Sequence, residues 1–185
     1  MTLKHSALLH QGRIIRLEHH TVEFPDRSTG ELDVVRHPGA CAVVPLLDAP
    51  DAPDPRVLLL RNFRHAAGGW LWEIPAGRLD PGEREHPERC AARELKEEAG
   101  CQAASLTRLV SIVTTPGFSD EVIHLYLATG LTRGAPAREA DEFMEVHEFP
   151  LSEVRRMIRD NEITDAKTLV GLLYFIGGLL GAGRG

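Results

Sequence analysis

The sequence predicts an α/β (α+β) protein with a small β segment at residues 1–39 and one main domain at 40–185. Three observations support this class. Short apolar or alternating runs, typical of strands, occupy most of the first half of the chain. A helical pattern follows a loop that begins at Gly77, and two further helical patterns lie near the C-terminus. The 185 residues are enough to bury one sizeable core.

The N-terminal elements are expected to be strands. Residues 12–24 alternate between apolar and polar side chains, which predicts a half-buried strand. A turn at 25–30 and a returning strand at 32–36 would complete a β-hairpin or small sheet. An unbroken apolar run follows at 40–47, as in strands that are buried on both faces. The next strands are expected at 56–63 and 71–74.

The second half of the chain combines helices and strands. A helix is predicted at 88–99, because Gly100 occupies the position at which helices commonly end. Strands are expected at 106–113, 121–129 and 142–149, a helix at 151–159, and a last helix from Asp165 to about 180.

Composition limits the possible functions. The net charge of −6 argues against nucleic acid as a partner, since a phosphate backbone requires a basic surface. Cys41, Cys90 and Cys101 are odd in number and lack the spacing of metal ligands, so we expect buried thiols in a reducing cytoplasm. The apolar stretch at 168–183 is too short to span a bilayer, so we expect a buried helix and no membrane association.

The most informative stretch runs from Gly77 to Cys101. On a helix, Glu94 and Glu98 share one face and Glu97 lies beside Glu94, so their charges repel unless a cation compensates. Hard divalent ions such as Mg²⁺ prefer carboxylate oxygens together with substrate phosphate. A solvated acidic helix face would give the same local pattern, and the surrounding residues decide between the two readings.

Those residues resemble the Nudix box, whose fixed positions match Gly77, Glu83, Arg93, Glu94, Leu95, Glu97, Glu98 and Gly100. Two departures occur. Nine residues instead of seven separate Glu83 from Arg93, so Glu85 has the standard spacing from Arg93 and the loop carries two extra residues. Cys101 replaces an aliphatic residue. The resemblance implies a Nudix fold, which is a mixed β-sheet sandwiched between helices.

Further segments resemble the ADP-ribose pyrophosphatases of that family. They are His37–Ala40, Arg61–Arg64, Glu73–Gly77, Thr115–Glu121 with Pro116 sixteen residues after Gly100, and Asp165–Thr168. The resemblance implies hydrolysis of ADP-ribose to AMP and ribose 5-phosphate, with Mg²⁺ or Mn²⁺ as cofactor and two or more ions bound. Two alternatives remain: hydrolysis of another nucleoside diphosphate sugar such as GDP-mannose, and a non-catalytic domain that senses ADP-ribose.

The resemblance also implies site residues. Metal ligands would be Glu94, Glu98, Glu97 and the carbonyl of Ala76, with Arg93 orienting a box carboxylate. The general base would be a late-loop acid, with Glu142 preferred over Glu139 and Asp141. Substrate contacts would come from Arg36, Arg64, Glu73, Gly117 and Phe118.

Two points about the substrate site stay open at this stage. Trp70 and Trp72 would lie on the same side of their strand, and core packing is a more common role for such residues than stacking on a base. Asp33 and Val34 stand where some relatives hold adenine between aromatic rings, so adenine recognition should differ here. The family likeness further implies a homodimer that exchanges its N-terminal segments, with Arg36 or its neighbours reaching the other subunit's site.

Overall fold

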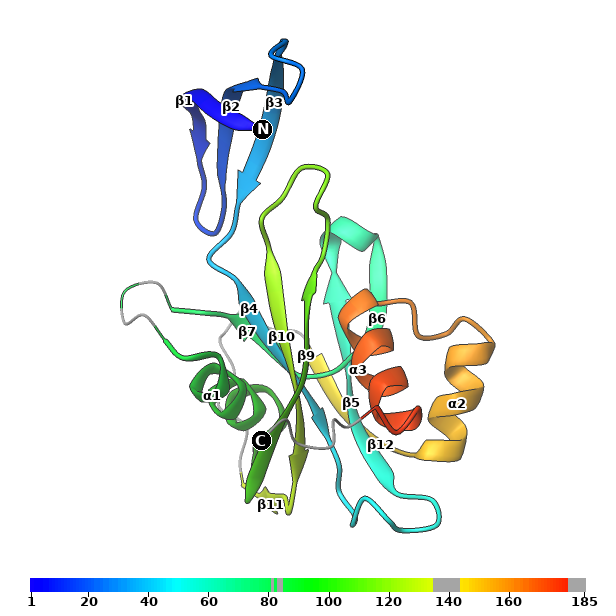
Figure 1. The fold of residues 1–185 in the computed structure, drawn as a ribbon. Helices are drawn as coiled ribbons and strands as arrows, with labels where there is room; N and C mark the ends of the chain where they lie inside the picture. The colour runs from blue at the N-terminus through cyan, green and yellow to red at the C-terminus, as the bar shows by residue number, and fades with distance from the viewer. Residues whose placement is uncertain (81, 83–84, 135–143, 180–185) are drawn as a thin grey trace, which may run out of the picture. The chain divides into compact units, whose positions relative to one another are not determined.

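The computed structural model describes residues 1–80, 82, 85–134 and 144–179 (Figure 1). The chain forms two compact units. The first consists of Met1–Gly39 and Ile112–Ile123, and the second of Ala40–Ser111 and His124–Gly185. The first unit therefore includes a central segment that the sequence prediction had placed with the rest of the chain.

The first unit contains a three-stranded antiparallel sheet. Its strands are β1 (Thr2–Gln11), β2 (Arg16–Glu23) and β3 (Thr29–Arg36), in that order across the sheet. The predicted small sheet is present, but β1 was not anticipated. Nearly all of β1 is exposed on both faces, so its sequence lacks the alternation that marks a half-buried strand. The backbone N–H of Val35 donates to the carbonyl of Phe118, which ties the 112–123 segment to β3.

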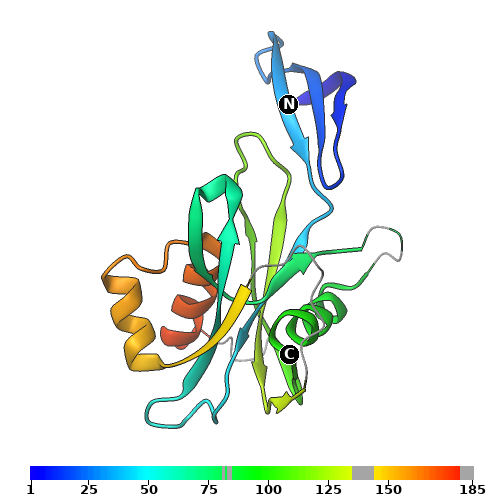
Figure 2. The same ribbon diagram turned by 180° about the vertical axis from the view of Figure 1, so that it is seen from behind.

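Among the described residues, three further sheets lie mainly in the second unit, and only the ends of β9 and β10 belong to the first. The largest has the order β7-β4-β10-β9, the next β12-β5-β6, and the smallest β11-β8 (Figure 2). Their bounds are β4 (Ala40–Pro45), β5 (Arg56–Arg64), β6 (Gly69–Glu73), β7 (Ala76–Arg78), β8 (Cys101–Gln102), β9 (Ser105–Val113), β10 (Val122–Thr129), β11 (Thr132–Arg133) and β12 (Met144–Pro150). A short 3-10 helix, η1 (His65–Ala67), connects β5 to β6.

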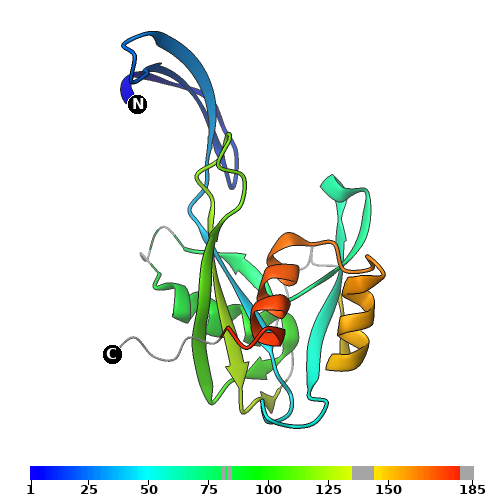
Figure 3. The ribbon, with the colours of Figure 1, turned by 45° about the vertical axis from the view of Figure 1, so that its right-hand side comes forward.

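Helices α1 (Pro87–Ala99) and α3 (Ala166–Ile176) cover opposite sides of β4, and α2 (Leu151–Arg159) follows β12 directly (Figures 1 and 3). All six residues of β4 are buried, as predicted for a strand covered on both faces. Val43 packs in the core cluster beneath α1. On the α3 side a Cβ at Gly171 would lie 2.9 Å from Cγ2 of Val44, so glycine allows this close approach.

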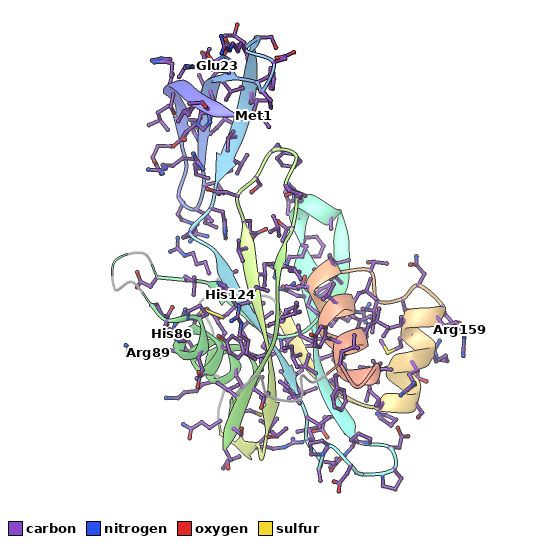
Figure 4. All side chains as sticks on the ribbon, viewed as in Figure 1. Met1, Glu23, His86, Arg89, His124 and Arg159 are labelled. Atoms are coloured by element: carbon purple, nitrogen blue, oxygen red, sulfur yellow. A yellow bond between two sulfur atoms is a disulfide. The ribbon has the colours of Figure 1, made fainter. Side chains whose placement is uncertain are left out.

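Helix α1 begins and ends where its sequence signals indicate. The ring of His86 accepts a hydrogen bond from the backbone N–H of Glu88, and Pro87 occupies the first turn (Figure 4). Gly100 ends the helix with a left-handed φ of 65°, and its N–H donates to the carbonyls of Leu95 and Lys96. These caps fix the helix that carries the acidic box residues.

The cysteines correct one sequence prediction. Cys41 on β4 and Cys90 on α1 form a disulfide, with their Cα atoms 6.2 Å apart. The expectation of three free thiols is therefore wrong for this pair, and it holds for Cys101, which is buried and free. The bonded cysteines are 49 positions apart in the sequence, and only the packing of α1 on β4 brings them together.

The last helix is shorter than expected. Helix α3 ends at Ile176, and Thr168, Gly171, Leu172 and Phe175 are its buried residues. Within the described part of the chain, no helix has the length and apolar character needed to cross a membrane.

Candidate active site

Two carboxylates of α1 form the centre of the candidate site. Glu94 and Glu98 are only 7% and 4% exposed, whereas the side chain of Glu97 is 40% exposed. The spacing of four residues places Glu94 and Glu98 one turn apart on the face of α1 that packs on β4 and β7. Burying two like charges so close together is costly without compensating partners.

The strand that leads into the helix supplies part of that compensation. The backbone N–H of Ala76 donates to Oε2 of Glu98 at 2.8 Å. Gly77 lies so close to the other carboxylate that a Cβ there would stand 1.9 Å from Oε1 of Glu94. A side chain at this position would force the Glu94 carboxylate to move. Both buried carboxylates are therefore pressed against the backbone of β7.

Arg93 connects the helix carboxylates to the loop. Its Nη1 donates to Oε1 of Glu94 at 2.5 Å and to Oε2 of Glu97 at 3.0 Å. Its Nε and Nη2 donate to the two carboxylate oxygens of Glu85, at 3.1 and 3.0 Å. These carboxylates raise the pKa of Arg93, and Arg93 in turn lowers the pKa of Glu85. Glu85, the residue with the standard spacing from Arg93, is thus the acid that holds Arg93 among the described residues of the loop.

A second charged cluster lies at the junction of β5 and β6. Arg64 donates from Nε and Nη2 to Oε1 and Oε2 of Glu73, both at 2.7 Å. Glu73 is 2% exposed, and Lys167 of α3 donates to its Oε2 at 2.9 Å. Burial alone would raise the pKa of Glu73, but the two cations outweigh it and the pKa is lowered. Glu98 is among the carboxylates that raise the pKa of Arg64, so this cluster adjoins the box.

Three of the predicted substrate residues belong to the first unit. Arg36 donates to Glu18 from Nε and to Asp120 from Nη1, both at 2.9 Å. Phe118 is 56% exposed in a turn that also contains Gly117. Arg64, Glu73 and the box residues belong to the second unit. The structure thus groups the predicted residues into these two sets.

Four acids named in the sequence analysis, Glu83, Glu139, Asp141 and Glu142, lie outside the described residues. The tryptophans are described. Trp72 meets Phe149 edge-on at 5.1 Å, and Trp70 meets Phe63 edge-on at 5.6 Å. The guanidinium of Arg61 lies over both tryptophan rings. Trp70 is 47% exposed and Trp72 is only partly buried, so both rings pack at the surface and the expected core packing is not found.

The residues around the box suit a hard metal ion in their chemistry. The carbonyl of Ala76 and the carboxylates of Glu94, Glu97 and Glu98 offer only oxygen atoms, the donors that Mg²⁺ and Mn²⁺ prefer. Among the described residues, no group of three or more acidic, histidine or cysteine side chains has the arrangement of a metal site. In this structure Arg93 forms ion pairs with the carboxylates of Glu94 and Glu97.

One contact of the site could not be anticipated from the sequence. Lys167 and Glu73 are 94 positions apart, and no spacing rule joins them. The segment Asp165–Thr168 resembled the family, but it received no role. Only the docking of α3 beside β6 reveals its contact with the site.

Comparison with known proteins identifies the family. The NUDIX domain family matches residues 36–170, and the chain belongs to this family. A solved structure described as an ADP compounds hydrolase superimposes with a TM-score of 0.81, covering 100% of this chain and 96% of the other at 22% identity. The predicted Nudix fold is thereby confirmed.

The curated relatives carry several names. An ADP-ribose pyrophosphatase of Bacillus subtilis (strain 168) is 37% identical over 165 residues, which are 88% of this chain and 85% of that protein. A methanol dehydrogenase activator of Bacillus methanolicus is 36% identical with the same coverage. A GDP-mannose pyrophosphatase of Citrobacter koseri is 35% identical over 127 residues, 64% of this chain and 65% of that protein.

Proposed function

We propose that the chain hydrolyses the pyrophosphate bond of ADP-ribose and releases AMP and ribose 5-phosphate. The observation that carries this proposal is the burial of Glu94 and Glu98 against Ala76 and Gly77, next to the Arg64–Glu73 pair. Similarity to ADP-ribose pyrophosphatases over most of the chain supports this substrate. GDP-mannose is the second candidate, since relatives with that name match a smaller part of the chain.

The oxygen donors of Ala76, Glu94, Glu97 and Glu98 would hold Mg²⁺ or Mn²⁺, with two or more ions bound. Such ions neutralise the pyrophosphate and lower the pKa of a bound water. The chain's own residues provide orientation. Arg93 fixes the carboxylates of Glu94 and Glu97 by direct hydrogen bonds. A base must accept the proton of the attacking water, and Glu142 takes that role, with Glu139 and Asp141 as alternatives.

Arg64 is the proposed phosphate contact in the second unit. Its guanidinium is anchored on Glu73 through two nitrogens, yet its side chain remains 46% exposed. An arginine held in this way presents a fixed planar edge to a phosphate oxygen. Glu73 therefore acts in substrate binding by orienting Arg64.

We further propose that the protein acts in the cytoplasm as a homodimer that exchanges residues 1–39. Exposed leucines on β1 support the dimer: Leu3, Leu8 and Leu9 are each more than half exposed, and a second subunit would cover them. In such a dimer Arg36, Gly117 and Phe118 would help to complete a substrate site that includes residues of the other subunit.

Release of AMP from ADP-ribose tests the function. Purified protein is assayed with Mg²⁺, and separately with EDTA, on ADP-ribose, GDP-mannose, UDP-glucose, NADH and diadenosine polyphosphates. We expect metal-dependent cleavage that is fastest for ADP-ribose. Faster cleavage of GDP-mannose would replace the substrate assignment, and binding of ADP-ribose without any cleavage would favour a sensing domain.

A further inference from the structure

The first turn of α3 contains a compact hydrogen-bonded cluster, made of Asp165, Lys167 and Thr168. Oδ2 of Asp165 accepts from the backbone N–H and the hydroxyl of Thr168, at 3.0 and 2.6 Å, and from Nζ of Lys167 at 3.0 Å. Asp165 is thus the N-cap of the helix. The side chain of Lys167 is only 11% exposed, so its ammonium depends on these carboxylate partners.

This cluster is attached to the strand that leads into the box. The hydroxyl oxygen of Thr168 accepts the backbone N–H of Ile74 at 2.9 Å, and Lys167 reaches Glu73, the preceding residue. Ile74 is followed by Pro75 and then by Ala76, whose N–H donates to Glu98. The start of α3 therefore contacts the backbone only a few bonds from a buried box carboxylate.

The carboxylate of Glu73 is shared between two cations. Within the described residues, its Oε1 accepts from Arg64, whereas its Oε2 accepts both from Arg64 and from Lys167. The Arg64 fork is planar, so its direction follows the plane of the carboxylate. Lys167, itself held by Asp165, donates to the same Oε2 and so restrains that plane.

We propose that Lys167 is a positioning residue for substrate binding, which holds Glu73 and thereby aims the exposed edge of Arg64 at the pyrophosphate of the substrate. This inference rests on the proposed function, because it assumes that Arg64 contacts the phosphate. It gives the Asp165–Lys167 segment a role in affinity in addition to its role as a helix cap.

A set of variants tests the proposal by equilibrium binding. Titration calorimetry with ADP-ribose in EDTA measures affinity without turnover, and kcat and KM are then measured with Mg²⁺. K167M removes the charge, K167Q removes it but keeps a hydrogen-bond donor, and K167R keeps it. S152A is the control, because it removes a hydroxyl that donates to Asp54 at the start of another helix, α2, and leaves the Lys167–Glu73 pair in place.

We expect K167M and K167Q to weaken ADP-ribose binding by about tenfold, the scale of one charge-assisted hydrogen bond, and to raise KM more than they lower kcat. K167R should recover most of the affinity. S152A should lower the melting temperature while binding stays within about twofold of wild type. In an R64A background, K167M should change affinity by less than about twofold, since its effect passes through Arg64.

Several results would overturn the inference. Wild-type affinity in both K167M and K167Q would do so, as would an S152A variant that binds as weakly as K167M. An undiminished effect of K167M in the R64A background would show that Lys167 acts by another route. The proposed function fails separately, when wild-type protein neither binds nor cleaves ADP-ribose, and the inference then falls with it. If K167M does not fold, K167Q is measured in its place, alone and combined with R64A, and the same results support or overturn the inference.

Discussion

Substitution of Gly77 by alanine gives the sharpest structural prediction. The new Cβ would stand 1.9 Å from Oε1 and 2.1 Å from Cδ of Glu94, whereas Cβ atoms essentially never approach other heavy atoms closer than 3.0 Å. The carboxylate must therefore retreat by more than 1 Å. Arg93 opposes that movement, because it donates to the same oxygen.

The displacement should affect catalysis more than folding. A misplacement of this size in a catalytic constellation costs about 100-fold in rate, whereas overpacking costs about 1–3 kcal/mol of stability. We expect Gly77→Ala to lower kcat/KM for ADP-ribose by about 100-fold, measured as AMP release with Mg²⁺. Urea unfolding should show that the variant remains folded.

Gly69→Ala is the matched control, because its Cβ would meet no heavy atom within 4 Å and its backbone needs no left-handed φ. It should keep wild-type activity. Full activity of Gly77→Ala would refute the argument, since Glu94 would then be functional in a position different from the one described here.

Three further predictions concern the pairs around the site. Glu85→Gln should lower kcat/KM by about tenfold, because Arg93 loses its charged anchor. Glu83→Gln should have little effect. A larger loss in Glu83→Gln than in Glu85→Gln would make Glu83 the loop acid that serves the site. A reductant should lower the free energy of unfolding by about 2–4 kcal/mol, measured with urea, since the Cys41–Cys90 disulfide closes a long loop. The variant with serine at both positions should unfold at the same urea concentration with and without reductant. A wild-type urea curve that does not change with reductant would contradict the disulfide. The pKa of Glu73 lies below its ordinary value of 4.5, so the folded state binds this proton less tightly than the unfolded state does. The free energy of unfolding should therefore fall as the pH drops below about 4.5, and it should fall less steeply with pH in Glu73→Gln. Equal pH dependence in the two proteins would exclude this contribution.

Local signals in the sequence predicted the elements that carry the box. The prediction for α1 differs from the structure by one residue, because Gly100 and the turn around Pro87 mark both ends. The prediction for α2 has the same bounds as the structure. Strand β1 was missed because it buries almost nothing, and β8 and β11 were missed because two residues cannot show a period.

The site was predicted only as far as its motif extends. The box glutamates share a helix, so their spacing already places them on neighbouring faces. Contacts between distant segments had no such signal. The bonds between Cys41 and Cys90, and between Lys167 and Glu73, depend on how α1 and α3 dock on the sheets. Tertiary packing alone decides these pairs.

The central claim is that the buried carboxylate of Glu98 serves the hydrolysis of ADP-ribose. The most direct measurement is AMP release by wild type, Glu98→Gln and Glu88→Gln over a range of Mg²⁺ concentrations. Glutamine can still accept the hydrogen bond from Ala76, so the fold should be preserved, and Glu88 is an exposed acid of the same helix that serves as control. The account predicts at least about a 100-fold loss for Glu98→Gln alone. Wild-type activity in Glu98→Gln would contradict it.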